Sequence, residues 1–240
     1  MPLTPVDTLP LSEQIHRQLL GGILDGSLTG VLPSERELAE TFGVNRHAVR
    51  EAIKRLQQGR LVAVNQGGAT RVQSVPEHAG LDLLPSLIAA GGPAGAEVAV
   101  GVLELRASIG ADAVRFCAER SASVGADLLT DLPDASIAGP ELDDRAVAYW
   151  TAIVTGAQSL AIRLAYNTLL EGIAAIDGLP AGDRFVDVLR EESRKSDELA
   201  RIARLISEGD GDRAAQAARD LMTGSIRAAR ALVSDPSSAA

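Results

Sequence analysis

The sequence predicts a mostly α-helical protein in two parts, a short module that carries one β-hairpin and a longer all-helical part. Three observations lead to this fold class. Apolar residues recur at helical spacing over most of the 240 residues. Runs that favour strands are confined to residues 61–73, around a Gly-Gly pair. After residue 76, Gly-Pro or Asp-Gly steps separate many of the helical runs.

The first two expected helices have recognisable starts and stops. Within 11–25, Ile15, Leu19 and Ile23 recur every four residues and predict one apolar face. Gly26 breaks that pattern. A second helix is expected to open at Ser34, whose side chain can cap it, and Glu37 three residues later completes a capping box.

A tight turn is expected to lead into a third helix. Gly43 can take positive φ in that turn, and Asn45 can cap a helix that runs to about Gln58. This helix has two separate stripes, which predict one buried face and one exposed basic face. The apolar stripe is Val49, Ala52, Ile53 and Leu56, and the basic stripe is Arg46, Arg50 and Lys54.

Two short β-prone runs follow, at 61–64 and 70–73, and they predict a hairpin. The order helix, helix–turn–helix, hairpin is that of a winged helix-turn-helix. In this module the second helix of the turn enters the DNA major groove with its N-terminal residues at the base edges. Arg46 and Arg50 fall there, and an arginine can grip guanine O6 and N7 with two hydrogen bonds.

The rest of the chain predicts an antiparallel bundle of six or seven helices. Domain boundaries follow: residues 1–75 form the winged helix-turn-helix, 76–233 form the bundle, and 234–240 form a disordered tail. The expected bundle helices span 81–89, 96–122, 126–132, 142–156, 160–176, 184–208 and 212–233.

The net charge of −9 would by itself argue against binding to nucleic acid. It is an average over two unlike parts. Residues 1–75 hold eight Lys/Arg and seven Asp/Glu, whereas residues 76–240 hold 15 and 25. Residues 45–58 alone carry a net charge of +3. A local basic patch is what attracts phosphate, because charges are screened over about 8 Å at cellular salt.

Several classes of protein are excluded by what the sequence lacks. The single cysteine, Cys117, cannot form an internal disulfide or a thiolate zinc site, which favours the reducing cytoplasm. Residues 1–25 do not resemble a signal peptide, and 86–103 is too polar to span a membrane. No phosphate-binding loop or nucleophile elbow is present, and no histidine follows His78. We expect no enzymatic activity and no cofactor.

The first module resembles the DNA-binding domain of GntR-family bacterial transcription regulators. The resemblance covers residues 11–73 and is carried by LPSERELA at 32–39, FGV at 42–44, Arg46, and VREAIKRL at 49–56. It implies contacts to operator DNA from three arginines and the tip of the wing. By match these are Arg36, Arg46, Arg50 and Gly67. His47, Gln66 and Arg71 are further candidates, and Lys54 is expected to touch phosphate or nothing.

The second part resembles the effector domain of the FadR branch of that family, through HAGLDLL at 78–84, LELRA at 103–107 and LISEGD at 205–210. Most members of this branch bind a divalent metal through one aspartate and three histidines. Those positions appear here as Arg145, Tyr149, Leu199 and Leu221. Such side chains cannot coordinate a transition metal, so we expect no metal.

Apolar residues at these positions would make the bundle interior more apolar. A metal-free member of the branch in enteric bacteria binds long-chain acyl-CoA, which makes a fatty acid or acyl-CoA the leading effector. Arg106 and Arg163 can meet a carboxylate or phosphate, or serve as salt-bridge partners. Core packing is the competing interpretation for the apolar residues. The candidate effector residues are Arg106, Tyr149, Trp150, Leu199 and Leu221.

The leading hypothesis is a homodimeric, effector-controlled repressor that binds double-stranded DNA at a pseudo-palindromic operator. Two alternatives stay open. The bundle could serve only for dimerisation, without a small effector. The chain could also be a lipid-binding or interaction bundle whose winged helix does not bind DNA, although the basic stripe on 45–58 speaks against it. Scarce lysine, only Lys54 and Lys195, hints at a high-GC bacterium, where similar metal-free regulators are associated with lipid genes.

Overall fold

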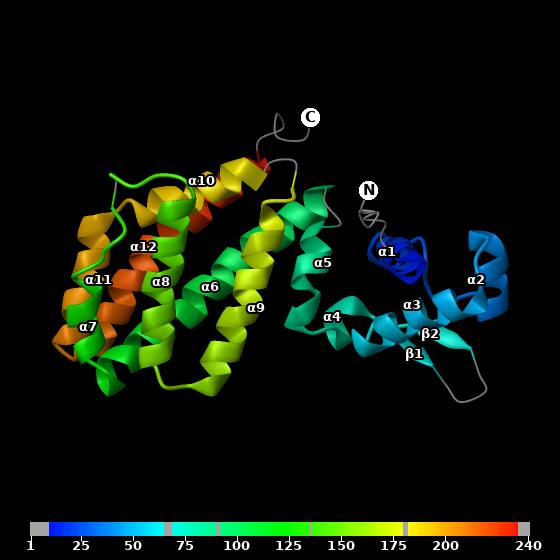
Figure 1. Cartoon of the computed structure of the whole chain (residues 1–240), viewed down its shortest axis with the longest axis horizontal. Coiled ribbons are helices and arrows are strands. Elements are labelled where there is room, and N and C mark those ends of the chain that lie inside the picture. The colour runs from blue at the N-terminus through cyan, green and yellow to red at the C-terminus, as the bar shows by residue number, and fades with distance from the viewer. Residues whose placement is uncertain (1–9, 65–68, 90–91, 135, 180–181, 235–240) are drawn as a thin grey trace, which may run out of the picture. The chain divides into compact units, whose positions relative to one another are not determined.

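The computed structural model describes residues 10–64, 69–89, 92–134, 136–179 and 182–234. The chain forms two compact units, which divide between Leu83 and Leu84. Figure 1 labels the elements, and each unit is described by itself. The first unit contains α1 (Leu11–Leu24), α2 (Glu35–Phe42), α3 (Arg46–Gln58), β1 (Val62–Val64), β2 (Thr70–Val72), α4 (Val75–His78) and the 3₁₀ turn η1 (Leu81–Leu83).

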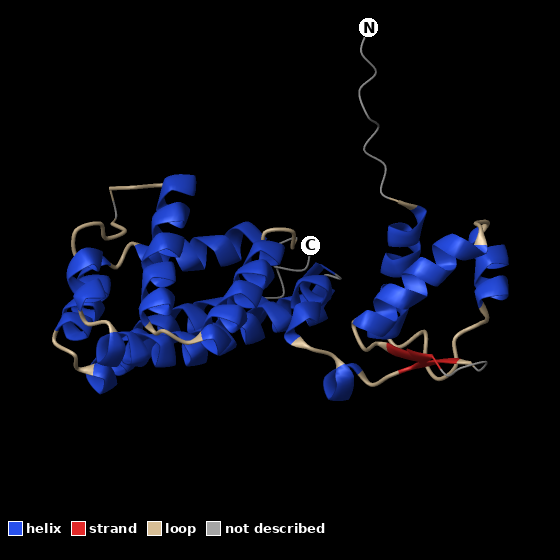
Figure 2. Ribbon diagram, turned by 60° about the horizontal axis from the view of Figure 1, so that its bottom comes forward, coloured by secondary structure: helices blue, strands red, loops and turns tan. Residues whose placement is uncertain are grey.

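Helix α3 packs on α1, on α2 and on the first strand of a two-stranded hairpin (Figure 2), which is the predicted winged helix-turn-helix. The strands are antiparallel, with Ala63 opposite Arg71. Val31 adds an isolated bridge to Arg71 and so ties the segment before α2 to the wing. The expected wing tip, with Gln66 and Gly67, lies outside the described residues. The core of this unit includes Ile15, Leu19, Leu38, Val49, Ala52, Leu56 and Leu61.

The second unit is an all-helical bundle built around α6 and α12, which pack along each other. Figure 1 shows α8 and α9 on one side of α6. Its core is rich in alanine, valine, leucine and isoleucine, as the low aromatic content of the chain requires. The helices are α5 (Leu84–Ala89), α6 (Gly92–Arg120), α7 (Ser123–Leu128), α8 (Pro140–Gly156), α9 (Leu160–Ile176), α10 (Gly182–Ser193), α11 (Ser196–Ser207) and α12 (Gly211–Ser234).

The prediction of a single helix over 184–208 is wrong. The chain leaves helical geometry at Lys195, with φ −82° and ψ 63°, so α10 and α11 are separate helices. The break lets α10 pack on α8 and α12 while α11 packs on α7 and α12. Asp197 and Glu198 occupy the first turn of α11, where acidic residues stabilise the positive end of a helix. This acidic pair was the available sign of a new helix.

Other expected ends shift by a few residues. Helix α6 begins at Gly92 rather than 96, since Pro93 is tolerated in a first helical turn. The helix expected over 126–132 is α7, which begins at Ser123 and ends at Leu128. Ser234, placed in the disordered tail, belongs to α12, and residues 235–240 lie outside the described residues.

Candidate nucleic-acid interface and bundle cavity

Local hydrogen bonds position α3, as the sequence predicted. The Ser34 backbone N–H donates to the Glu37 carboxylate at 2.8 Å, and the Glu37 N–H donates back to Ser34 Oγ. The Ser34 hydroxyl and then the Ser34 backbone N–H, which both donate to the Glu37 carboxylate, lower the pKa of Glu37. Gly43 takes φ 63° in the turn, and Asn45 Oδ1 accepts from the Ala48 N–H at 2.9 Å. The capping box, the glycine turn and the Asn45 cap are confirmed.

The two stripes of α3 face different surroundings. Val49, Ala52 and Leu56 are fully buried against the rest of the unit. Arg46, His47, Arg50 and Lys54 are exposed on the other side. The helix therefore presents a row of cations to solvent from a rigid base, which is the arrangement that a major-groove helix needs.

Acidic side chains engage two of the expected DNA-contacting arginines. Arg36 pairs with Glu40 one turn later, at 3.1 Å. Arg50 donates hydrogen bonds through Nε and Nη2 to the carboxylate of Glu35, the first residue of α2. The shortest distance, from Nη2 to Oε2, is 2.8 Å. Hydrogen bonding to Arg50 lowers the pKa of Glu35, and the charge of Arg46 acts in the same direction. Arg71, in β2, is exposed.

A different acid ties α1 to the basic helix. Glu13 accepts from Arg17, in α1, and from Arg55, near the end of α3. Because Arg55 is paired with Glu13 of the same unit, it does not belong to the basic stripe of α3. That stripe consists of Arg46, Arg50 and Lys54.

The bundle contains a cavity of about 280 Å³ between α6, α8, α9 and α10. Most of its wall is apolar, and three of its charged side chains, Arg106, Asp143 and Arg190, are in ion pairs. Its lining includes the candidate residues Arg106 and Trp150. The other lining residues are Asp143, Ala146, Val147, Tyr166, Leu169, Leu170, Ile173, Ala174, Asp177, Val186, Leu189, Arg190 and Ser193.

Arg106 is held by a buried carboxylate. Its Nη2 donates to Glu192 Oε1 at 2.6 Å and its Nη1 to Oε2 at 3.2 Å. Ser225 Oγ, from α12, donates to the same carboxylate at 2.6 Å. The guanidinium also lies 5.2 Å from the Trp150 ring centre. Arg106 is therefore a salt-bridge partner, one of the two roles that the sequence allowed, and the same residue also lines the cavity.

A second ion pair lies at the cavity wall. Arg190, on α10, donates two hydrogen bonds to Asp143 on α8, at 3.0 and 2.8 Å. These bonds raise the pKa of Arg190. Neither Arg190 nor Glu192 was a candidate from the sequence. Helix α10 carries several acidic and basic residues, and no sequence pattern marks these two as the ones that face the bundle interior.

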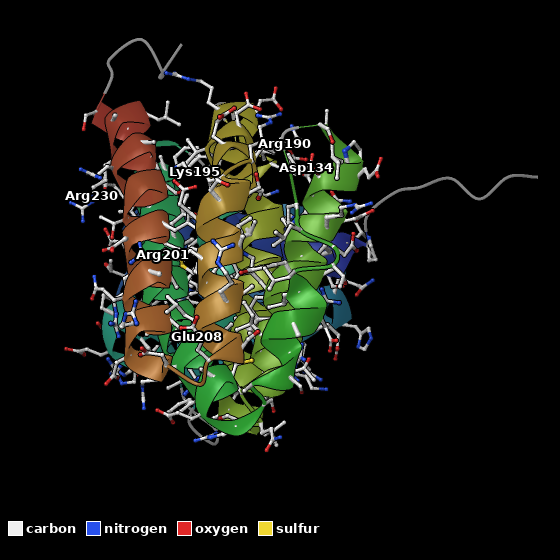
Figure 3. The ribbon with its side chains drawn as sticks, turned by 90° about the vertical axis from the view of Figure 1, so that its left-hand side faces the viewer. Asp134, Arg190, Lys195, Arg201, Glu208 and Arg230 are labelled. Atoms are coloured by element: carbon white, nitrogen blue, oxygen red, sulfur yellow. The ribbon has the colours of Figure 1, made fainter. Side chains whose placement is uncertain are left out.

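The remaining candidate effector residues lie apart from this cavity. Tyr149 and Leu199 are in the packed core, where the Tyr149 hydroxyl donates to the Leu199 carbonyl at 2.9 Å. Desolvation raises the pKa of Tyr149. Leu221 lines a smaller hollow of about 160 Å³ beside Lys195 and Arg201 (Figure 3). Arg163 bonds Thr155 instead of facing the main cavity.

No three His, Cys, Asp or Glu side chains in the described part of the chain gather as a metal site would require. No described helix combines the length and the apolar character needed to cross a membrane.

The fold and the α3 surface define a class, the winged-helix proteins that bind DNA. Residues 11–72 match the family model described as bacterial regulatory proteins, gntR family. The chain is 33% identical to the HTH-type transcriptional regulator Mce2R of Mycobacterium tuberculosis over 231 residues, 92% of each chain. The chain therefore belongs to the GntR family, and it is a DNA-binding transcriptional regulator rather than an enzyme.

Two further comparisons extend over different shares of the chain. The fatty acid metabolism regulator protein of Edwardsiella ictaluri is 33% identical over 118 residues, 48% of this chain and 49% of that one. The solved structure of Lar, from Listeria monocytogenes, has a TM-score of 0.55 over 95% of this chain and all of that chain, with 18% identity. The second likeness shows that the fold is shared.

Proposed function

We propose that this chain is a homodimeric repressor whose bundle binds a fatty acid or the acyl chain of an acyl-CoA, and that the ligand releases the protein from its operator. The observation that carries the effector half is the apolar cavity beside Trp150 and Arg106. The relative named as a fatty acid metabolism regulator supports the choice of ligand.

The chemistry of the cavity supports an apolar guest. Apolar side chains from α8, α9 and α10 form most of its wall, with leucine, isoleucine and valine prominent among them, and burying methylenes against them is favourable by about 0.8 kcal/mol each. Its volume, about 280 Å³, is at the small end for ligand pockets. An acyl chain is therefore the part that enters, and a bulky head group such as coenzyme A stays outside.

DNA binding is proposed to use residues of α2, α3 and the wing. Two copies of α3 would read the halves of a pseudo-palindromic operator, since dimeric helix-turn-helix proteins place their recognition helices one helical turn of DNA apart. The proposed contacts are Arg36, Arg46, His47, Arg50, Gln66, Gly67 and Arg71. Footprinting on the region upstream of the chain's own gene tests this. Arg46→Ala should lose the footprint, and a retained footprint would overturn the assignment.

Trp150 is the only tryptophan in the chain and lines the cavity, so its fluorescence reports on the cavity directly. Titration with palmitate or palmitoyl-CoA should change the emission and weaken operator binding. Because coupling is reciprocal, operator DNA should weaken ligand binding by the same factor.

Two alanines on α8 provide a matched pair of variants. Ala146 lines the cavity, whereas Ala148 is exposed on the same helix. Ala146→Leu should fill the cavity and abolish the fluorescence response, and Ala148→Leu should leave it unchanged. If operator affinity stays constant at saturating ligand, the proposed control by a bundle ligand is wrong, and a bundle that only dimerises is favoured.

A further inference from the structure

An ion pair lies on the face of the first unit that is proposed to meet DNA. Glu35 begins α2, and Arg50 is on α3, so the pair joins the two helices of the helix–turn–helix. Arg50 Nε lies 3.1 and 3.2 Å from the two Glu35 carboxylate oxygens, and Nη2 lies 2.8 Å from Oε2. The Arg50 side chain is 64% exposed and that of Glu35 is 35% exposed.

The hydrogen bonds use only one edge of the guanidinium. Nε and one N–H of Nη2 point to Glu35, and no described residue accepts a hydrogen bond from the edge formed by Nη1 and the second N–H of Nη2. That open edge is itself a two-donor fork, which fits guanine O6 and N7 or two phosphate oxygens. Arg50 can therefore hold Glu35 and a nucleic acid at the same time.

The carboxylate also has a cost on this face. An acid beside Arg46 and Arg50 cancels part of the positive field that attracts phosphate, and that field supplies nearly all of the affinity for DNA of any sequence. The presence of Glu35 on this face is explained if its carboxylate fixes the orientation of the Arg50 side chain. An arginine with a free three-methylene stem loses side-chain entropy when it docks, and a bidentate partner removes part of that loss beforehand.

We propose that Glu35 is a positioning residue for DNA recognition: it holds Arg50 by the Nε edge so that the Nη1/Nη2 edge meets the operator. The same carboxylate lowers the affinity for unrelated DNA. Glu35 thus raises the ratio of specific to nonspecific binding by both routes. The inference rests on the proposed role of Arg50 as a DNA contact.

The test measures the full-length protein on two duplexes, the footprinted operator and a scrambled duplex of equal length, by fluorescence anisotropy over a salt series. Glu35→Gln should bind the scrambled duplex more tightly, and its ratio of specific to nonspecific affinity should fall by about tenfold, the size expected for one misplaced bidentate contact. Glu51→Gln, on α3, removes the same charge without touching Arg50 and serves as the control.

Two more variants separate geometry from charge and from folding. Glu35→Asp keeps the charge but is one methylene shorter, so it should also lose specificity while nonspecific affinity stays as in the wild type. In the Arg50→Ala background, Glu35→Gln should still tighten binding to the scrambled duplex, but it should not weaken operator binding any further, because the side chain that Glu35 positions is already gone. Thermal unfolding of each variant confirms that the fold is intact.

The outcomes distinguish the inference from the assignment beneath it. If Arg50→Ala lowers specificity while Glu35→Asp and Glu35→Gln leave it unchanged, Arg50 contacts DNA and the positioning role of Glu35 is wrong. If Arg50→Ala leaves specific binding intact, the proposed contact fails and the inference fails with it. If Glu51→Gln reproduces Glu35→Gln, the effect is charge alone and the positioning role is again refuted.

Discussion

At the scale of single residues, the buried pair of Arg106 and Glu192 joins three helices. Arg106 comes from α6, Glu192 from α10, and Ser225 from α12 completes the carboxylate's hydrogen bonds. The Glu192 side chain is only 2% exposed. Its neighbour Glu191 pairs with Arg194 at the surface instead. Glu191 and Glu192 therefore pair with different arginines, one at the surface and one in the core, because adjacent side chains on a helix point in different directions.

Removing the buried acid should be costly. Glu192→Ala leaves the Arg106 guanidinium buried without its partner, and we expect a loss of about 3–5 kcal/mol in the free energy of unfolding. Glu191→Ala should change it by less than about 0.5 kcal/mol, as surface substitutions do. Urea denaturation measures both, and similar losses for the two variants would contradict the role of the pair.

Cys117 should be unreactive in the folded protein. It is fully buried, and desolvation raises the pKa of its thiol from 9.0 to about 11. Alkylation at neutral pH should be slow for the native chain and fast in denaturant. Because the folded pKa is raised, the unfolded state ionises first, so stability should fall as pH rises from about 9 towards 11. Fast native alkylation would show that the core opens there.

At the scale of elements, close contact between α7 and α11 depends on a glycine. A Cβ built on Gly125 would lie 2.3 Å from the Ala203 carbonyl oxygen and 2.5 Å from the Ser207 nitrogen. Both are backbone atoms, which cannot turn aside as a flexible side chain can. The two helices can approach this closely only while position 125 has no side chain.

Two glycine variants should therefore move stability in opposite directions. Gly125→Ala should destabilise the bundle by about 1–3 kcal/mol through overpacking. Gly101→Ala, on the exposed side of α6 with nothing within 4 Å of the added methyl, should stabilise it by about 0.5–1 kcal/mol. Thermal unfolding of the two variants checks the signs, and a stabilised Gly125→Ala would refute the close contact.

The sequence predicted elements best where a local rule determines them. The Ser34 cap, the Gly43 turn and the Asn45 cap each depend on a few neighbouring residues, so α2 and α3 could be placed closely. The break before α11 depends on how two helices pack against different partners, and periodicity alone does not reveal it. The cavity depends on tertiary placement too. Arg106 and Trp150 line it, whereas Tyr149 and Leu199 pack in the core.

At the scale of the whole molecule, the two units carry very different charge. Residues 1–83 hold eight Lys/Arg and nine Asp/Glu, a net charge of −1, whereas residues 84–240 hold 15 and 23, a net charge of −8. Most of the acidity therefore belongs to the bundle and not to the unit that carries the basic stripe of α3. We expect it to repel DNA that the recognition surface does not hold.

This charge division predicts a salt-dependent difference in nonspecific binding. A fragment of residues 1–83 should bind a scrambled duplex more tightly than the full chain at low salt. The gap should close as salt rises, because the screening length shrinks from about 30 Å at 0.01 M to about 3 Å at 1 M. Anisotropy titrations measure both proteins. Equal affinities at low salt would show that the acidic bundle does not oppose DNA binding.

Helix α6 has a mechanical consequence of its own. Its 29 residues form a rod about 44 Å long, and Arg106, at the cavity wall, sits near the middle. The N-terminal end lies about 21 Å from Arg106 and packs against α5, the first helix of the second unit. A tilt of about 5° around Arg106 would move that end by about 2 Å. The helix can therefore act as a lever about Arg106, because a small rotation beside the cavity becomes a larger shift at the start of the bundle.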